Sequence, residues 1–130
     1  MIDTTQHSQV TILVHNSLSV SQTRVTSVRI KATRKVKIID NRTNEPVPMQ
    51  VVEDELTDDV YTVYFLASTP PMGYSTFTLI NTGERIAQDP KYLAKVTRIS
   101  EEELTSHHLT TDDLSLLMDS RGMLRTCVCE

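Results

Sequence analysis

Apolar and polar residues alternate along much of the first half of the chain with a period of two, which is typical of a β-strand with one buried face. Residues 24–31 are an example, because Val28 and Ile30 fall on one face and Arg29 and Lys31 on the other. Residues 10–16 form a short apolar run, which we expect to be a strand buried on both faces. Residues 60–67 form the longest apolar run and are expected to be a central strand.

Turn-forming residues separate the apolar runs and predict two hairpins. The polar segment 40–46 contains Asn, Asp and Pro and lies between the apolar residues 36–39 and 47–52. The sequence Pro-Pro-Met-Gly at 70–73 lies between the longest apolar run and the strand-like residues 74–80. In each case we expect the two flanking runs to pair with each other.

The pattern weakens after residue 80. Residues 92–99 are a possible strand, and Ser100 with Glu103 has the spacing of a capping box. We expect residues 1–8 to be disordered or a linker and residues 9–80 to form a small antiparallel β-sandwich domain. Residues 81–111 are expected to be an irregular connection, and residues 112–130 to be the first hairpin of a following β-domain.

The composition agrees with an all-β fold. Val, Ile and Thr together supply 39 of the 130 residues, whereas the chain has only four Ala and three Gly, and β-branched side chains favour strands. Apolar residues make up 38% of the chain and Trp is absent. This is enough for a small hydrophobic core, although a domain of this size leaves much of its surface exposed.

The charge balance argues against two classes of partner. Thirteen basic and seventeen acidic residues give a formal net charge of -4, so a generic nucleic-acid partner or an anionic membrane surface is not expected. No stretch approaches the ~18–20 apolar residues that span a bilayer, and the polar first eight residues contain no apolar signal-peptide core.

The histidines give no metal motif. Of His7, His15, His107 and His108, only the last two are adjacent, and neighbours in an extended chain point to opposite faces. A zinc site needs three or four convergent protein ligands. We therefore expect ordinary loop or surface histidines.

Cys127 and Cys129 fall on one face of a strand, with Cα atoms about 6.6 Å apart at the usual rise of a strand. The first interpretation is two buried, small apolar residues. A disulfide to sequence beyond Glu130 and a redox or metal role are the alternatives.

Asn41-Arg42-Thr43 matches the N-glycosylation acceptor pattern in a predicted exposed turn. Modification of Asn41 requires a secretory compartment, and a plain turn is the alternative. The acidic residues at 53–59 and 101–103 lie in polar loops, so we expect solvated charges rather than a catalytic acid and base. The sequence contains no nucleophile elbow, Walker loop or dinucleotide fingerprint.

Four segments in order carry a family resemblance. They read VTILVHNSL at residues 10–18, VKIID at 36–40, EPVPMQV at 45–51 and VYFLASTPPMGYSTF at 63–77. The series resembles glycoside hydrolase family 38, the lysosomal-type α-mannosidases. In that family a V-V-V-x-N-P-L strand, a V-P-S-Q-V segment and a P-x-L-G-Y-x-T-Y turn follow each other in the β-rich region after the catalytic part.

The resemblance extends to the C-terminal part of the chain. Residues 112–124 resemble the family's N-E-Y-L-x-L-x-F-D-x-x-G-L-L entry into its large β-sandwich. Ser17 stands where the family has Pro, and residues 81–108 have no family counterpart that aligns.

The resemblance implies a function for a larger protein. Members of the family are zinc-dependent retaining α-mannosidases whose zinc ligands and Asp nucleophile lie in domains before the β-rich region. No position here matches the family's H-x-D zinc motif, so no catalytic or metal-binding residue is carried over. The expectation is a non-catalytic β-sandwich segment that supports the catalytic domain of a lysosomal or secreted enzyme. Its partners would be the remaining domains and, through the parent, an oligomannoside.

Two other functions remain open. The chain could be a stand-alone binding module, possibly carbohydrate-directed, although sugar-binding faces usually display aromatic platforms and most of the six aromatic residues fall in predicted core strands. Alternatively, the acidic loop at residues 53–59 could border the active-site cleft of the parent and influence substrate choice without taking part in the chemistry.

Overall fold

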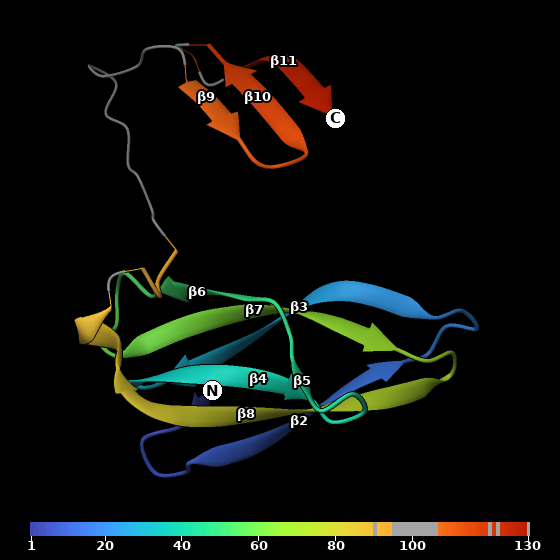
Figure 1. Cartoon of the computed structure of the whole chain (residues 1–130), viewed down its shortest axis with the longest axis vertical. Coiled ribbons are helices and arrows are strands. Elements are labelled where there is room, and N and C mark those ends of the chain that lie inside the picture. Colours follow the sequence, from blue (N-terminus) through green and yellow to red (C-terminus); the bar gives the residue numbers. More distant parts are fainter. Residues whose placement is uncertain (90, 95–106, 120, 122, 130) are drawn as a thin grey trace. The chain divides into compact units, whose positions relative to one another are not determined.

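The structure is a computed structural model that describes residues 1–89, 91–94, 107–119, 121 and 123–129. The chain divides into two compact units, Met1–Lys95 and Val96–Glu130, which are described separately (Figure 1). The described residues contain no helix long and apolar enough to cross a membrane.

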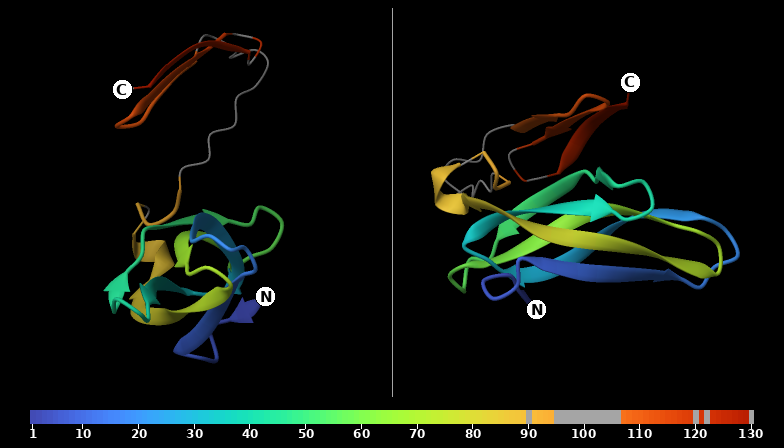
Figure 2. Two further views of the ribbon diagram at one scale, coloured as in Figure 1. Left: turned by 90° about the vertical axis from the view of Figure 1, so that its right-hand side faces the viewer. Right: turned by 60° about the horizontal axis from the view of Figure 1, so that its bottom comes forward.

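The first unit contains two four-stranded sheets among its described residues, as we expected for a small, largely antiparallel β-sandwich. One sheet has the order β1 (Ile2–Asp3), β3 (Gln22–Lys31), β7 (Val60–Thr69), β6 (Met49–Glu53), and the other β2 (Gln9–Asn16), β8 (Gly73–Arg85), β4 (Arg34–Asp40), β5 (Glu45–Pro46). The sheets are layered face to face (Figure 2). The central positions of β7 and β8 bring the strongest β-forming runs to the middle of the unit.

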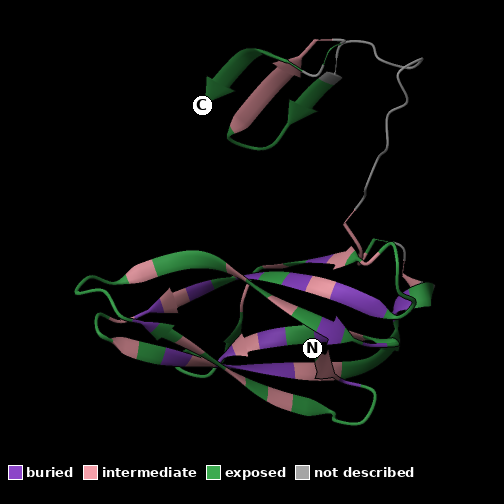
Figure 3. Ribbon diagram, turned by 180° about the vertical axis from the view of Figure 1, so that it is seen from behind, coloured by how far each residue is buried: buried purple, intermediate pink, exposed green. Residues whose placement is uncertain are grey.

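The core lies between the two sheets and draws on both of them. Buried and exposed residues alternate along the strands, so that each sheet presents one buried face to the other (Figure 3). Phe65 of β7 and Phe77 of β8 meet edge to face, with ring centroids 5.3 Å apart and ring planes at 63°. Ile30, Ile38 and Leu79 are buried in the same cluster. The expectation of a central strand at residues 60–67 is confirmed.

Both predicted hairpins are wrong in their strand pairing. After the turn at residues 41–44, only Glu45–Pro46 pairs with β4. The chain then crosses to the other sheet, where β6 pairs with β7. Likewise β7 and β8 lie in different sheets, so residues 70–72 form a crossover. The alternation of side chains determines which face of a strand is buried, but it does not determine which strand lies beside it.

The N-terminal residues are more ordered than we expected. Ile2–Asp3 forms β1 and pairs in parallel with β3. Thr4 is buried, and both its N–H and its hydroxyl donate to the carbonyl of Lys31 at 3.0 Å. The expectation of a linker over residues 1–8 is therefore wrong at this end.

Strand β2 is not buried on both faces, contrary to our expectation. It lies at the edge of its sheet, and exposed and partly buried residues alternate along it. Leu13, on the outer face, is 60% exposed. The apolar run of residues 10–16 resembled a doubly buried strand because Leu13, on the outer face, interrupts the alternation of apolar and polar residues.

The sandwich continues past residue 80, where we expected an irregular connection to begin. Strand β8 runs to Arg85, and the 3-10 helix η1 (Ile86–Gln88) places Ile86 in the core. The hydroxyl of Tyr92 accepts the N–H of Val36 at 2.9 Å and donates to its carbonyl at 3.1 Å. Leu93 forms a single bridge with Val51. The rest of the possible strand at residues 92–99, with the capping box at Ser100, lies outside the described residues.

The second unit contains a three-stranded antiparallel sheet in the order β11-β10-β9 among its described residues. Its strands are β9 (His107–Thr110), β10 (Leu114–Met118) and β11 (Leu124–Cys129). The expected hairpin is confirmed as β10 and β11, with a register shift between Leu117 and Met118. Strand β9 falls within residues 81–111 and was not expected there.

Candidate functional site

Asn16 connects the turn after β2 with the crossover before β8 at one end of the sandwich. It ends β2, is only 5% exposed, and uses its whole side-chain amide. Its Nδ2 donates to the carbonyls of Val20 at 2.8 Å and Pro70 at 2.9 Å, while its Oδ1 accepts the N–H of Leu18 at 2.9 Å. The N–H of Met72 donates to the carbonyl of Leu18 at 2.8 Å. The turn after β2 and the crossover before β8 are thereby joined.

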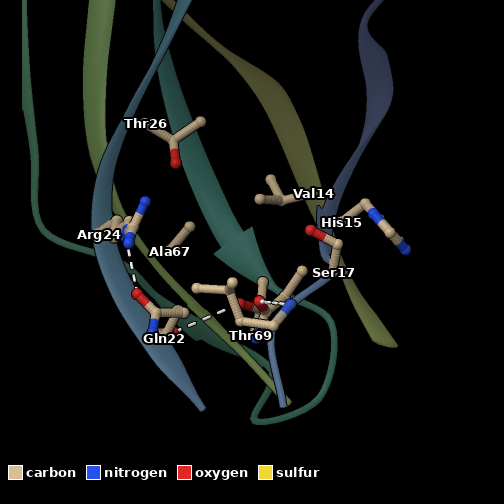
Figure 4. A pocket seen from close by; sticks show the side chains of 10 residues that line it. Val14, His15, Ser17, Gln22, Arg24, Thr26, Ala67 and Thr69 are labelled. Carbon is tan, nitrogen blue, oxygen red and sulfur yellow. Dashed lines mark hydrogen bonds between the residues drawn. The ribbon is translucent and has the colours of Figure 1, made fainter. Parts of the chain in front are cut away.

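A polar cleft of about 170 Å³ opens beside this junction. Gln22, Arg24 and Thr26 of β3 form one wall, and β2 with the residues that follow it forms the other (Figure 4). The alternation of β3 places Arg24 on the same side of the strand as the partly buried Val28 and the buried Ile30. Arg24 itself is exposed, because residues 23–25 lie at the open end of the strand.

Arg24 is the charged group of the cleft. Its Nε donates to Oε1 of Gln22 at 2.7 Å, which orients the guanidinium. Within the described part of the chain no carboxylate pairs with Arg24, so its terminal nitrogens are available. The hydroxyls of Thr26 and Thr69 line the same cleft, although that of Thr69 already donates to the carbonyl of Gln22 at 3.4 Å. This arrangement can bind a carboxylate or another oxygen-rich group.

Asn41, the expected glycosylation acceptor, lies in an exposed turn as predicted. Its Nδ2 donates to Oγ1 of Thr76 at 3.1 Å, and its Oδ1 accepts the hydroxyl of Thr78 at 2.7 Å. A glycan on Nδ2 would replace one amide hydrogen and leave the Oδ1 contact possible. Modification of Asn41 stays a prediction.

Two tyrosines are exposed, although most of the aromatic residues were expected in the core. Tyr64 is 40% exposed on β7 and Tyr74 is 61% exposed on β8. Tyr74 borders a shallow depression together with Asn41, Arg42 and Thr76. An exposed ring beside amide, guanidinium and hydroxyl groups is a combination that can contact a sugar.

Two loop carboxylates, Asp54 and Asp119, accept hydrogen bonds from their own turns and pair with arginines. The N–H of Leu56, and after it the guanidinium of Arg29, hold the pKa of Asp54 below its usual value. The N–H groups of Met123 and Arg121 similarly lower the pKa of Asp119. A general acid needs the opposite shift. The acidic residues at 101–103 lie outside the described residues.

The histidine and cysteine residues are placed as follows. The ring of His15 points away from the cleft (Figure 4), and Nε2 of His108 lies 2.6 Å from Oγ of Ser115. The described residues contain no group of three or more side chains arranged to hold a metal ion. Cys127 and Cys129 lie on one face of β11, as expected, but both are exposed, so the expectation of burial is wrong.

Comparisons with known proteins add no further assignment: no protein-family model matches the chain, and no curated protein shows a significant match. Sequence reasoning missed Arg24 and Tyr74. The signal for Arg24 was available, because it lies on the same side of an otherwise amphipathic strand as Val28 and Ile30. Tyr74 gave no such signal, since a tyrosine fits either face of a strand.

Proposed function

We propose that this chain is a non-catalytic β-sandwich segment of a zinc-dependent retaining α-mannosidase of glycoside hydrolase family 38, and that it supports the catalytic domain. The observation that carries the proposal is the ordered series of motifs. Two of them, Asn16-Ser17-Leu18 and Pro70-Pro71-Met72-Gly73, are far apart in sequence but joined by the Asn16–Pro70 and Leu18–Met72 hydrogen bonds. The two motifs thus form one structural junction.

The other motif segments also have packing roles. Residues 47–51 lead into and form part of β6, which pairs with residues 61–65 of β7. Asp40, at the end of the VKIID segment, pairs with Phe77 in β8. These contacts suit a structural module, since each motif contributes a strand or a turn rather than a reactive group.

The hydrogen-bonding roles of two loop carboxylates agree with this proposal. A retaining glycosidase places two carboxyl groups about 5–5.5 Å apart, one as nucleophile and the other as acid. Here the carboxylates of Asp54 and Asp119 accept hydrogen bonds from backbone N–H groups of their own loops. A zinc site built from three or more side chains does not fit the described residues. The proposal therefore assigns both zinc and the nucleophile to other parts of the parent enzyme.

The outer face of β3 and β7 carries exposed apolar side chains. Val25 is 68% exposed and Leu66 is 41% exposed, and the two are register partners on neighbouring strands. Tyr64 and Pro48 border the same apolar depression. Apolar side chains on the outer face of a sheet suit a contact with another domain.

The experiment isolates the natural protein with an antibody raised against the acidic loop at residues 53–59. The captured protein is measured by denaturing mass spectrometry and assayed for hydrolysis of an aryl α-mannoside, with and without a zinc chelator. We expect a species several times heavier than 14.7 kDa with chelator-sensitive activity. Antibody blocked with the purified chain serves as the control.

Two results would overturn the proposal. One is a lone species near 14.7 kDa without co-purifying fragments or mannosidase activity. The other is zinc-dependent mannosidase activity from the purified chain itself. Location of the captured protein in a lysosomal or secreted fraction tests the compartment that the resemblance implies.

A stand-alone, possibly carbohydrate-directed, binding module is the second candidate, favoured by the exposed ring of Tyr74 beside Asn41 and Arg42. Saturation-transfer NMR with mannosides would show transfer from Tyr74 to the sugar if this function holds. Tyr74→Ala should abolish the transfer, whereas Tyr64→Ala should not. Equal signals from both variants would rule out a site at this depression.

A further inference from the structure

The two cysteines form a preorganised pair of thiols. Strand β11 lies at the edge of its sheet, where Cys127 pairs with Leu116 and Cys129 pairs with Leu114. Because the two positions are two residues apart in a strand, their side chains leave the same face. Their Sγ atoms are 4.0 Å apart, and both residues are free and exposed.

This separation suits a bridging ion better than a disulfide. A disulfide requires an S–S distance of about 2.05 Å, and Cα atoms two residues apart in a strand lie near the upper limit for one, so closure would bend β11. A linear, two-coordinate ion with metal–sulfur bonds of about 2.3 Å needs sulfurs about 4.6 Å apart, a little wider than the 4.0 Å observed. An ion could therefore bind with only a small rotation of the two side chains.

The choice of ion follows from the type and number of ligands. Thiolates select soft cations, whereas calcium and magnesium require oxygen ligands. The described residues offer no third His, Cys, Asp or Glu side chain arranged with the pair, and a structural zinc site needs four ligands. Cu(I) is soft and is satisfied by two sulfur ligands. We propose that Cys127 and Cys129 form a chelating dithiol site for Cu(I).

The surroundings of the pair are consistent with this role. Cys127 and Cys129 are both exposed, so an ion can reach the two sulfurs from solvent. Two thiols and one Cu(I) give a bis-thiolate complex of charge -1 and two protons, with no change in oxidation state. Leu114 and Leu116, the register partners on β10, provide apolar side chains beside the sulfurs.

The test uses the full chain, reduced and kept free of oxygen, in competition with a chromophoric Cu(I) chelator. We expect one Cu(I) per chain, and X-ray absorption should show sulfur ligands only. Cys127→Ser and Cys129→Ser should each weaken binding by about a hundredfold or more, because the second thiolate acts at a high effective concentration. Both sites are exposed, so the fold should be preserved, and circular dichroism checks this.

A rearranged pair is the matched control. The double variant Val128→Cys/Cys129→Ser keeps two cysteines but places them on opposite faces of β11, so it should bind as weakly as the single variants. Equal affinity of this variant and the natural chain would overturn the proposal, as would failure of the natural chain to compete with the chelator. A 2:2 complex by size-exclusion chromatography, or zinc binding as tight as that of Cu(I), would also overturn it.

Discussion

Replacement of Asn16 by Ala tests whether one buried amide fixes the junction between β2 and the crossover before β8. The substitution removes three hydrogen bonds, to the carbonyls of Val20 and Pro70 and from the N–H of Leu18. A typical bond contributes about 0.5–1.5 kcal/mol net, and a partner left buried without a bond costs more. The neighbouring cleft lets water reach some of these groups. We expect a loss of about 3 kcal/mol.

The assay is thermal and urea unfolding of the full chain, followed by the near-ultraviolet circular dichroism of tyrosine. All four tyrosines of the chain lie within Met1–Lys95, so this signal reports on the sandwich alone. For a domain of this size, a loss of about 3 kcal/mol lowers Tm by roughly 12–24 °C. The sandwich should stay folded at room temperature, because domains have about 5–15 kcal/mol of stability.

Asn81→Ala is the matched control. Asn81 lies within β8, and its Oδ1 accepts the N–H of Gly83 in a solvent-exposed hydrogen bond, the loss of which usually costs about 0.5 kcal/mol or less. If Asn16→Ala cost no more than Asn81→Ala, the assignment of Asn16 as the residue that fixes this junction would be refuted.

Asn16→Asp gives a second test through pH. The new carboxyl keeps the acceptor for Leu18 but turns an oxygen toward the carbonyls of Val20 and Pro70, and only its protonated form can donate to one of them. Folding should therefore raise the pKa of this carboxyl above the unfolded value of about 3.9. The added stability is present below that value and is lost as the pH rises through the folded pKa. A deficit equal at pH 4 and pH 7 would contradict this reasoning.

Three further predictions concern other parts of the sandwich. Phe77→Ala removes a fully buried ring from the core and should cost about 3–5 kcal/mol in urea unfolding; a cost below about 1 kcal/mol would contradict the packing. The hydrogen bond from Lys35, then that from the N–H of Lys91, lowers the pKa of Asp89, so this stabilisation is present above about pH 4 and is lost as the pH falls through the lowered pKa. Unfolding measured at decreasing pH should show a smaller loss of stability for Asp89→Asn than for the natural chain. The same pH dependence of stability in both proteins would refute the role of Asp89. Gly83 has φ of 86° with open space around its Cβ position, so Gly83→Ala should lower stability by only about 1 kcal/mol in a Tm measurement, and no loss at all would contradict the strain.

The existence of most strands could be predicted from the sequence, whereas their partners could not. β3 and β7 could be recognised from their own residues, because a strand with a buried face needs apolar side chains at the buried positions. β6 pairs with β7, and β8 pairs with β2 and β4, because the chain crosses between the sheets after Pro46 and at residues 70–72. No residue at either place distinguishes a crossover from a hairpin. Contacts between distant segments, such as that of Asn16 with Pro70, have no local signal.

The candidate sites were harder to predict for a related reason. Arg24 can be identified as a candidate only when it is known which side of β3 faces the other sheet. Tyr74 can be identified only when its side chain is known to be exposed. The cysteines were expected to be buried because Cys is among the most buried residue types. Strand β11 is an edge strand with every residue exposed, and a residue-type average cannot anticipate that.

The outer face of β7 offers a test of the packing role itself. Leu66 lies on that face, 41% exposed beside Val25. In the isolated chain Leu66→Thr should change stability by less than about 0.5 kcal/mol, because Thr is a good strand residue and little burial is lost. If this face packs on the parent enzyme as proposed, the same substitution would remove buried apolar contacts there and cost about 2 kcal/mol or more. The test is the change in Tm that Leu66→Thr causes in the isolated chain and in the parent enzyme. Equal changes would mean that this face stays in contact with water in the parent, and the supporting role would need another surface.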